Sequence, residues 1–298
     1  MSIKKIWSIV RKSVKTLKSS QPLILGSATA FFTLFSLAPI IIITINVMSL
    51  YFKREMVSEK LYTKLATLFG QDTAVQFQSI ADNFREQASS VWITIGGSIF
   101  LAFVSTTLFH VIRSAINQIW SVKIRPASRI GHNLRQRSEA LVIIFVGGLL
   151  FAVSLFADTF ITVLNNYMDR LVPSVDLALI KVVSFIVSLI TVSLWFAILF
   201  KYLPDARLRG KDAIVGGLFT GVLFSIGKYI LAKVLITDNL NNIFGASASV
   251  MLVLLFIFYS SIIMYFGAAF TKNWACECGS DITPKKNAEF YTIQSLKE

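Results

Sequence analysis

Six apolar blocks, each at least as long as the roughly 20 residues that a helix needs to cross a bilayer, constrain this chain more than any other feature. Of its 298 residues 55% are hydrophobic and 15% are charged, whereas soluble domains carry about 25% charged residues. A soluble fold has too little interior to hide so much apolar surface. The sequence therefore predicts an all-α polytopic membrane protein, with a membrane domain at 22–272 and six transmembrane helices over 23–52, 91–120, 141–164, 177–200, 213–236 and 246–271.

The segments before and after this membrane domain differ from it in composition. Residues 1–21 contain six cations and no acid, and their apolar residues recur at three- or four-residue spacing: Ile3, Trp7, Val10, Val14 and Leu17. This pattern predicts a basic amphipathic helix on the inner membrane surface. Residues 273–298 have balanced charge and predict a mobile, polar cytoplasmic tail.

The net charge of +13 is explained better by membrane topology than by nucleic-acid binding. The loop 121–138 carries five cations and no acid, and the loop 201–212 carries four cations against two acids. Because basic loops stay in the cytoplasm, we expect these loops and both chain ends to lie inside the cell. We expect no nucleic-acid partner.

Residues 53–90 form the one sizeable outer segment, with five cations and five acids. Two apolar stripes, separated at Gly70, predict two short amphipathic helices on the outer face. Their members are Val57, Leu61, Leu65 and Leu68, followed by Phe77, Ile80 and Phe84.

Ionisable residues inside the predicted spans are costly in a bilayer and are therefore candidates for function. Asp158 and Lys228 both lie roughly 22–26 Å from the cytoplasmic ends of their helices. They can meet in the outer leaflet. For Lys181 and Lys233 we favour snorkelling to the outer interface, and for Lys228 a buried or cavity-facing role stays open.

Two further groups of residues belong to single spans. The first span is polar around its proline, which fits either a substrate path or helix packing; the candidates are Thr33, Ser36, Pro39 and Asn46. The fifth span carries a ridge of small residues formed by Gly217, Gly221 and Ser225. Such a ridge favours close helix packing over ligand binding.

The residues needed for hydrolysis are sparse. His110 and His132 are the two histidines of the chain, and no acid lies beside either in the sequence. Cys276 and Cys278 have no second pair of ligands after them, so we expect reduced cysteines that bind no metal. No P-loop or dinucleotide fingerprint occurs. We therefore expect a protein that is not an enzyme and needs no cofactor or metal.

The chain resembles the YihY/BrkB family of six-span inner-membrane proteins over roughly residues 23–271. The most specific stretch is a Leu-Pro pair and basic loop leading into a span, in which the motif residues are Pro204, Arg207, Arg209 and Asp212. Further similarities are Pro39, the end of the second span, the Gly227–Lys228 pair and Phe244–Gly245. The resemblance implies a multi-pass protein of the bacterial inner membrane. The family's former ribonuclease label is not supported by the histidine and carboxylate content.

Three functions remain open from the sequence. The first is transport or flipping of a lipid or other amphiphile of the cell envelope, with membrane lipids as partners. It is favoured by Lys228, the polar first span and the surface helices. The alternative is an envelope assembly or structural partner, and the least favoured is a ribonuclease.

The topology is testable by cysteine labelling in intact cells. In a background lacking Cys276 and Cys278, a cysteine at Ser79 should react with an impermeant reagent, because residues 53–90 are predicted outside. A cysteine at Ser128 should be protected, because its loop is basic. The reverse labelling pattern would contradict the predicted orientation.

Overall fold

Apolar runs become helices of 26 to 30 residues in the computed structural model. It describes residues 3–69, 71–87, 91–125, 137–150, 153, 177–235, 248–278 and 280–291. The helices are α1 (Ile3–Ser19), α2 (Pro22–Met48), α3 (Arg54–Phe69), α4 (Gln71–Gln87), α5 (Val91–Trp120), α7 (Leu177–Tyr202), α8 (Gly210–Leu235) and α10 (Ala248–Glu277), and residues 137–150 are also helical. The strands are β1 (Val122–Ile124), β2 (Ala206–Arg207), β3 (Thr283–Pro284) and β4 (Ala288–Phe290).

Four helices in the described part of the chain are long and apolar enough to cross a membrane. They cover Pro22–Met48, Val182–Tyr202, Gly210–Ile230 and Val250–Glu277. Large apolar side chains on these helices face outward, as a hydrocarbon environment requires; examples are Phe185, Ile190, Ile214 and Ile226. Helix α5 covers the predicted block 91–120. Of the predicted block 141–164, only residues 141–150 and 153 are described.

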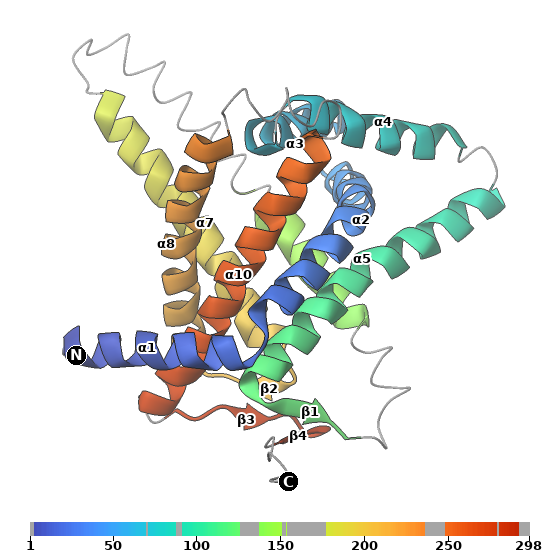
Figure 1. The fold of residues 1–298 in the computed structure, drawn as a ribbon. Coiled ribbons are helices and arrows are strands. Elements are labelled where there is room, and N and C mark those ends of the chain that lie inside the picture. The colour runs from blue at the N-terminus through green and yellow to red at the C-terminus, as the bar shows by residue number, and fades with distance from the viewer. Residues whose placement is uncertain are drawn as a thin grey trace.

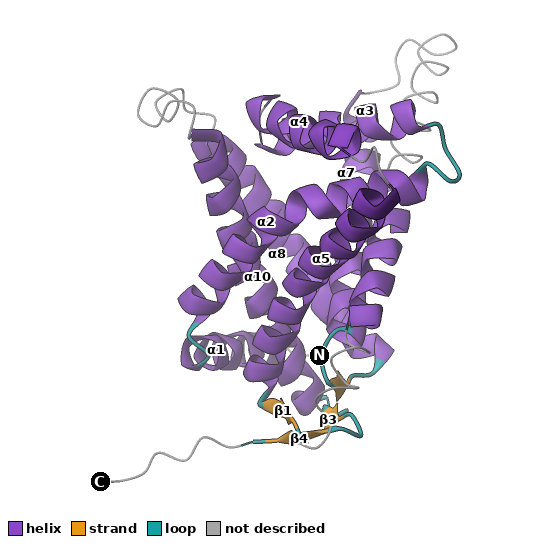
Figure 2. Cartoon of the chain, turned by 90° about the vertical axis from the view of Figure 1, so that its right-hand side faces the viewer, coloured by secondary structure: helices purple, strands orange, loops and turns teal. Residues whose placement is uncertain are grey.

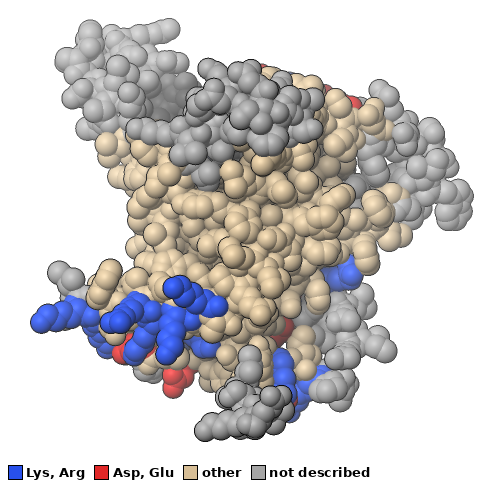
Figure 3. Space-filling model, viewed as in Figure 1, with Lys and Arg blue, Asp and Glu red and all other residues tan. Residues whose placement is uncertain are grey.

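Helix α1 lies across one end of the bundle (Figure 1), which we call the basic end. Its buried face, with Ile9 and Ser13, packs on α10, where the Asn273 side chain donates to Ser13 Oγ at 3.2 Å. Its exposed face carries the cations that gather there in Figure 3. A helix is therefore present at the predicted position, but Trp7 and Val14 of the predicted apolar stripe are exposed.

The predicted mobile tail is wrong for the described part of residues 273–298. Helix α10 runs on to Glu277, which pairs with Lys12 of α1. Strand β3 then pairs with β2, and β4 pairs with β1 in the register Val122↔Phe290. These partners lie far away in sequence, so local composition gave no sign of them.

Helices α3 and α4 lie across the opposite end of the bundle (Figure 2), which we call the distal end. They occupy the two predicted positions on either side of residue 70. Val57, Leu61 and Leu65 of the first predicted apolar stripe and Phe77 of the second are buried in one cluster with Ile41, Ile45 and Met48 of α2. Ile80 of the second stripe is exposed.

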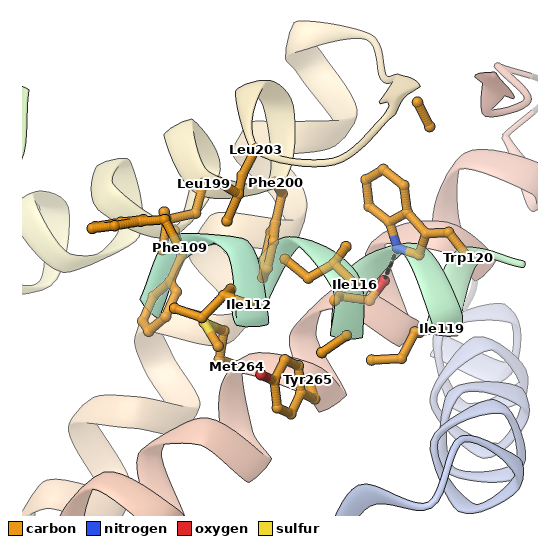
Figure 4. Packing of buried hydrophobic residues seen from close by; sticks show 14 of the residues in the cluster. Phe109, Ile112, Ile116, Ile119, Trp120, Leu199, Phe200, Leu203, Met264 and Tyr265 are labelled. Carbon is orange, nitrogen blue, oxygen red and sulfur yellow. Dashed lines mark hydrogen bonds between the residues drawn. The ribbon is translucent and has the colours of Figure 1, made fainter. Parts of the chain in front are cut away.

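The largest apolar core lies in the half of the bundle nearest the basic end, between α5, α7 and α10 (Figure 4). Trp120 is fully buried there, and its indole N–H donates to the Ala268 carbonyl at 2.9 Å. The Tyr265 hydroxyl hydrogen-bonds to Thr29 of α2. Both aromatic side chains thus have polar partners inside the core.

Glycines bring α8 against two neighbours. A Cβ on Gly217 would lie 2.4 Å from the Ser193 carbonyl oxygen, and one on Gly221 would lie 2.3 Å from Ser193 Oγ. Ser225, the third residue of the ridge, donates instead to the Gly221 carbonyl at 2.8 Å. The ridge therefore lies at the contact with α7.

A second glycine face of α8 was not predicted. Thr271 of α10 fills the space beside Gly216, and Thr220 of α8 fills the space beside Gly267 of α10. Each of the two helices thus contributes one glycine and one threonine to this contact.

We predict that Gly217→Val lowers the free energy of unfolding by about 1–3 kcal/mol, because the new side chain overlaps the α7 backbone. Gly148→Ala is the control, since its nearest neighbour would be Thr44 Cγ2 at 3.8 Å, an ordinary contact. Unfolding of the purified protein in mixed micelles measures both. Equal stability of the two variants would contradict the close α7–α8 contact.

Candidate functional site

A cavity of about 600 Å³ lies between α2, α5, α7, α8, α10 and the helix over 137–150, and we call it the interhelical cavity. Its wall is mainly aliphatic and aromatic, with Phe109, Trp195, Phe224 and Met264 among the lining residues. Cavities that bind small molecules have volumes of about 300–1,000 Å³. The interhelical cavity is therefore large enough for part of an amphiphile.

Hydroxyl groups in the cavity wall donate to their own helices. Thr33 donates to the Thr29 carbonyl at 2.6 Å, Thr191 to the Val187 carbonyl at 2.9 Å, and Ser260 to the Phe256 carbonyl at 2.7 Å. Because these donors are satisfied within the helix, they do not demand a polar ligand. The wall suits an alkyl chain.

Lys64 of α3 is the lysine that lines this cavity, at its distal end. Lys228 lies one helical turn beyond Phe224, a lining residue, and its own side chain is exposed. Asp158, its predicted partner, lies outside the described residues. The cavity lining thus includes Lys64, which the sequence did not single out, and does not include Lys228.

The polar residues predicted on the first span have different surroundings. Thr33 lines the cavity. Ser36 is buried and donates to the Val104 carbonyl of α5 at 3.0 Å, and Pro39 is buried within α2. Asn46 is exposed and accepts from Arg54 Nη1 at 3.0 Å. These four residues therefore do not form one continuous path.

The motif loop is divided between interior and surface. Pro204 and Asp212 are buried, whereas Arg207 and Arg209 are exposed. Asp212 lies in the first turn of α8, where a negative charge favours the helix N-terminus. The exposed arginines face away from the interhelical cavity and do not line it.

A buried polar cluster at the basic end is the main feature that sequence reasoning missed. Arg113 and Asp205 are each 2% exposed, with Arg113 Nη1 3.7 Å from Asp205 Oδ1. Arg113 Nη2 donates to Glu139 Oε2 at 2.7 Å. The Asn117 side chain donates to Asp205 Oδ2 at 2.7 Å and accepts from the Asp205 backbone N–H at 2.9 Å.

This cluster joins α5, the turn after α7 and the helix over 137–150. From the sequence alone, Arg113 is most simply an interfacial anchor. The available signal was the four-residue spacing of Arg113 and Asn117, which puts both on one face of α5. Their partner Asp205 lies 88 residues from Asn117, beyond the reach of any local pattern.

Two pockets adjoin the cluster. The smaller, of about 150 Å³, is lined by Thr106, Phe109, His110, Arg113, Arg137, Ala140 and Leu203, and we call it the Arg113 pocket. A more open pocket of about 420 Å³ shares His110 and Arg113 with it and also includes Lys123 and Tyr291. Within the described ranges, no group of three or more His, Cys, Asp or Glu side chains has the arrangement of a metal site.

The chain matches known proteins over most of its length. The model of the family described as Virulence factor BrkB matches residues 15–289. A UPF0761 membrane protein of Pseudomonas paraeruginosa is 28% identical over 252 residues, which are 83% of this chain and 58% of that protein. A UPF0761 membrane protein of Pseudoalteromonas translucida is 25% identical over 270 residues, 90% of this chain and 85% of that protein. The chain thus spans 58% of the Pseudomonas relative. No solved structure matches it.

We predict that Asp205→Ala lowers the free energy of unfolding by about 3–5 kcal/mol, because it leaves the buried Arg113 charge with one fewer partner. Glu289→Ala is the control. Its pairs with Lys123 and Arg125 are exposed, and such pairs contribute at most about 1 kcal/mol. Unfolding in mixed micelles measures both variants. If Asp205→Ala lowered the free energy of unfolding as little as Glu289→Ala does, the buried Arg113 charge would not need Asp205 as a partner.

Proposed function

The chain belongs to the BrkB family of membrane proteins, and from this premise we propose that it is a non-enzymatic protein that moves a lipid or other amphiphile of the cell envelope between leaflets. It is a multi-pass membrane protein. In the proposal it has six spans in the bacterial inner membrane, with both chain ends in the cytoplasm. The observation that carries the lipid assignment is the apolar interhelical cavity.

The distribution of charge supports the orientation. The cations of α1 gather at the basic end (Figure 3), and β2, which carries the exposed Arg207, lies at the same end (Figure 1). Cationic segments beside spans are retained on the cytoplasmic side. The distal segment 53–90 has equal numbers of cations and acids. It therefore opposes translocation across the membrane less than a cationic segment does. Helix α5 and the helix over 137–150 supply the two further spans of the proposal.

The dimensions of the cavity support a lipid substrate. Its lining on α2 extends from Thr29 to Thr44, about 22 Å along an ideal helix. That is a large share of a hydrocarbon core of about 30 Å. An acyl chain that enters the cavity exchanges bilayer hydrocarbon for apolar side chains, so its transfer costs little free energy.

Lys64 and Lys228 supply positive charge at the distal end of this path. Polybasic segments near a membrane surface attract anionic lipids by about 1 kcal/mol per cation. The Lys64 ammonium group, which lines the cavity, would be stabilised by the phosphate of a lipid. An anionic phospholipid is therefore the proposed substrate class.

We predict that purified protein in vesicles redistributes a labelled anionic phospholipid, and that Lys64→Ala and Lys228→Ala each slow this movement about tenfold. The reason is that a charge-assisted hydrogen bond contributes about 1.5–3 kcal/mol. Lys53→Ala is the matched control for Lys64→Ala, since Lys53 is exposed at the same end and does not line the cavity. Lys228 also lies outside the lining, and its variant tests the cation one helical turn beyond Phe224. Fluorescence quenching from the outer leaflet measures the rate.

Two results would contradict the proposal. The first is metal-dependent RNA cleavage by the purified protein that is lost when His110 or His132 is changed. This result would favour the ribonuclease function over lipid movement. Absence of both lipid movement and RNA cleavage would favour the envelope assembly partner.

A further inference from the structure

The Arg113 pocket adjoins the interhelical cavity at its end nearest the basic end of the bundle. Phe109 lines both spaces, so one aromatic side chain separates the polar pocket from the apolar cavity. On its other side the pocket shares His110 and Arg113 with the more open surface pocket. The polar Arg113 pocket and the apolar interhelical cavity therefore lie next to each other.

Arg113 presents an unused donor beside this pocket. Its side chain is 2% exposed, and Nη1 has no hydrogen-bond partner among the residues that the structure describes. The carboxylate of Asp205 lies 3.7 Å from Nη1, beyond hydrogen-bond distance, and Glu139 bonds to Nη2. Leaving a buried charged donor without a hydrogen bond costs more than about 1–3 kcal/mol, so a movement of the Arg113 side chain that lets Nη1 donate to a ligand in the pocket would be favoured.

Arg137 is held in position on the same pocket. Its Nη1 donates to Thr106 Oγ1 at 2.8 Å and to the Phe103 carbonyl at 3.3 Å. Its guanidinium lies over the Phe103 ring, 4.2 Å from the ring centroid. A side chain fixed in this way loses little conformational freedom when it binds a ligand.

The two charged side chains that line the pocket, Arg113 and Arg137, are both cationic. Glu139 and Asp205, which pair with Arg113, do not belong to the lining, and with the two arginines they bring the local net charge to zero. Among the described residues, the ion pairs do not include Arg137, whose charge therefore adds to the pocket. The planar guanidinium group of an arginine can donate two parallel hydrogen bonds to the oxygen atoms of a phosphate. Thr106 and His110 add further polar groups to the pocket.

We propose that the Arg113 pocket binds the phosphate group of a membrane lipid, whose acyl chain extends past Phe109 into the interhelical cavity. The lipid as ligand rests on the proposed function, whereas the phosphate site rests on Arg113 and Arg137. The pocket lies at the basic end and Lys64 at the distal end of the same cavity. A phosphate would thus meet cationic groups at both ends of the apolar path.

The test is binding to the purified full chain in nanodiscs, followed by native mass spectrometry with three probes. They are dioctanoyl phosphatidic acid, dioctanoylglycerol, which lacks the phosphate, and inorganic phosphate. We expect phosphatidic acid to bind at least about tenfold more tightly than either of the others, since it alone reaches both the pocket and the cavity. A tenfold change corresponds to about 1.4 kcal/mol.

The variant Arg137→Gln should weaken phosphatidic acid binding about tenfold and leave dioctanoylglycerol binding unchanged. Arg137→Lys keeps the charge but loses the fork, and should give a smaller loss. Arg125→Gln is the matched control, because Arg125 is an exposed arginine at the same end, paired with Glu289 outside the pocket. Thermal unfolding checks that each variant is folded, and Arg137→Lys carries the test if Arg137→Gln is not.

The outcomes separate this site from the proposed function. Unchanged phosphatidic acid binding in the folded Arg137 variants, or equal binding of dioctanoylglycerol, would overturn the phosphate site whatever the vesicle assay shows. Inorganic phosphate binding as tightly as phosphatidic acid would overturn the lipid assignment. Arg137-dependent binding of phosphatidic acid without lipid movement in vesicles would support the site and overturn only the proposed transport.

Discussion

The buried ion pair between Arg113 and Asp205 is the interaction on which the basic end of the bundle depends. Withdrawing both charges from water is unfavourable unless each finds partners, and here Asn117 and Glu139 supply them. The four residues come from three separate segments, so satisfying the charges fixes α5 against the turn after α7 and the helix over 137–150. The Lys285 backbone N–H adds a bond to the Asp205 carbonyl at 3.0 Å, which ties the last strands to the same point.

Polar and apolar groups are divided along the length of the molecule. In the middle, hydroxyls are satisfied by carbonyls of their own helices, and the interhelical cavity is left with an apolar wall. Cationic groups lie toward its two ends, Lys64 at one and Arg113 with Arg137 at the other. This order matches the order of a bilayer, in which headgroup layers enclose hydrocarbon, and it is the physical basis for assigning a lipid to the site.

Helix packing gives the cavity its boundaries. Glycine contacts hold α8 against α7 and α10 at backbone distance, and bulkier residues at the same positions would force these helices apart. At the distal end the apolar stripe of α3 packs on α2, so Lys64 is carried to the cavity by a helix that lies across the bundle. The same local amphipathicity that predicts α3 therefore also positions a charged group of the site.

The sequence by itself determined the all-α membrane class, four of the spans, the amphipathic helices at both ends of the bundle and the BrkB family. These features depend on spacings of three or four residues, or on runs of about 20 apolar residues, and both are local. The tertiary structure alone decided that residues 280–291 pair with β1 and β2, that Arg113 meets Asp205, and that Lys64 reaches the cavity. Asn117 and Asp205 of the buried cluster, for example, lie 88 positions apart, and no periodicity records which side chains will meet once the helices have packed.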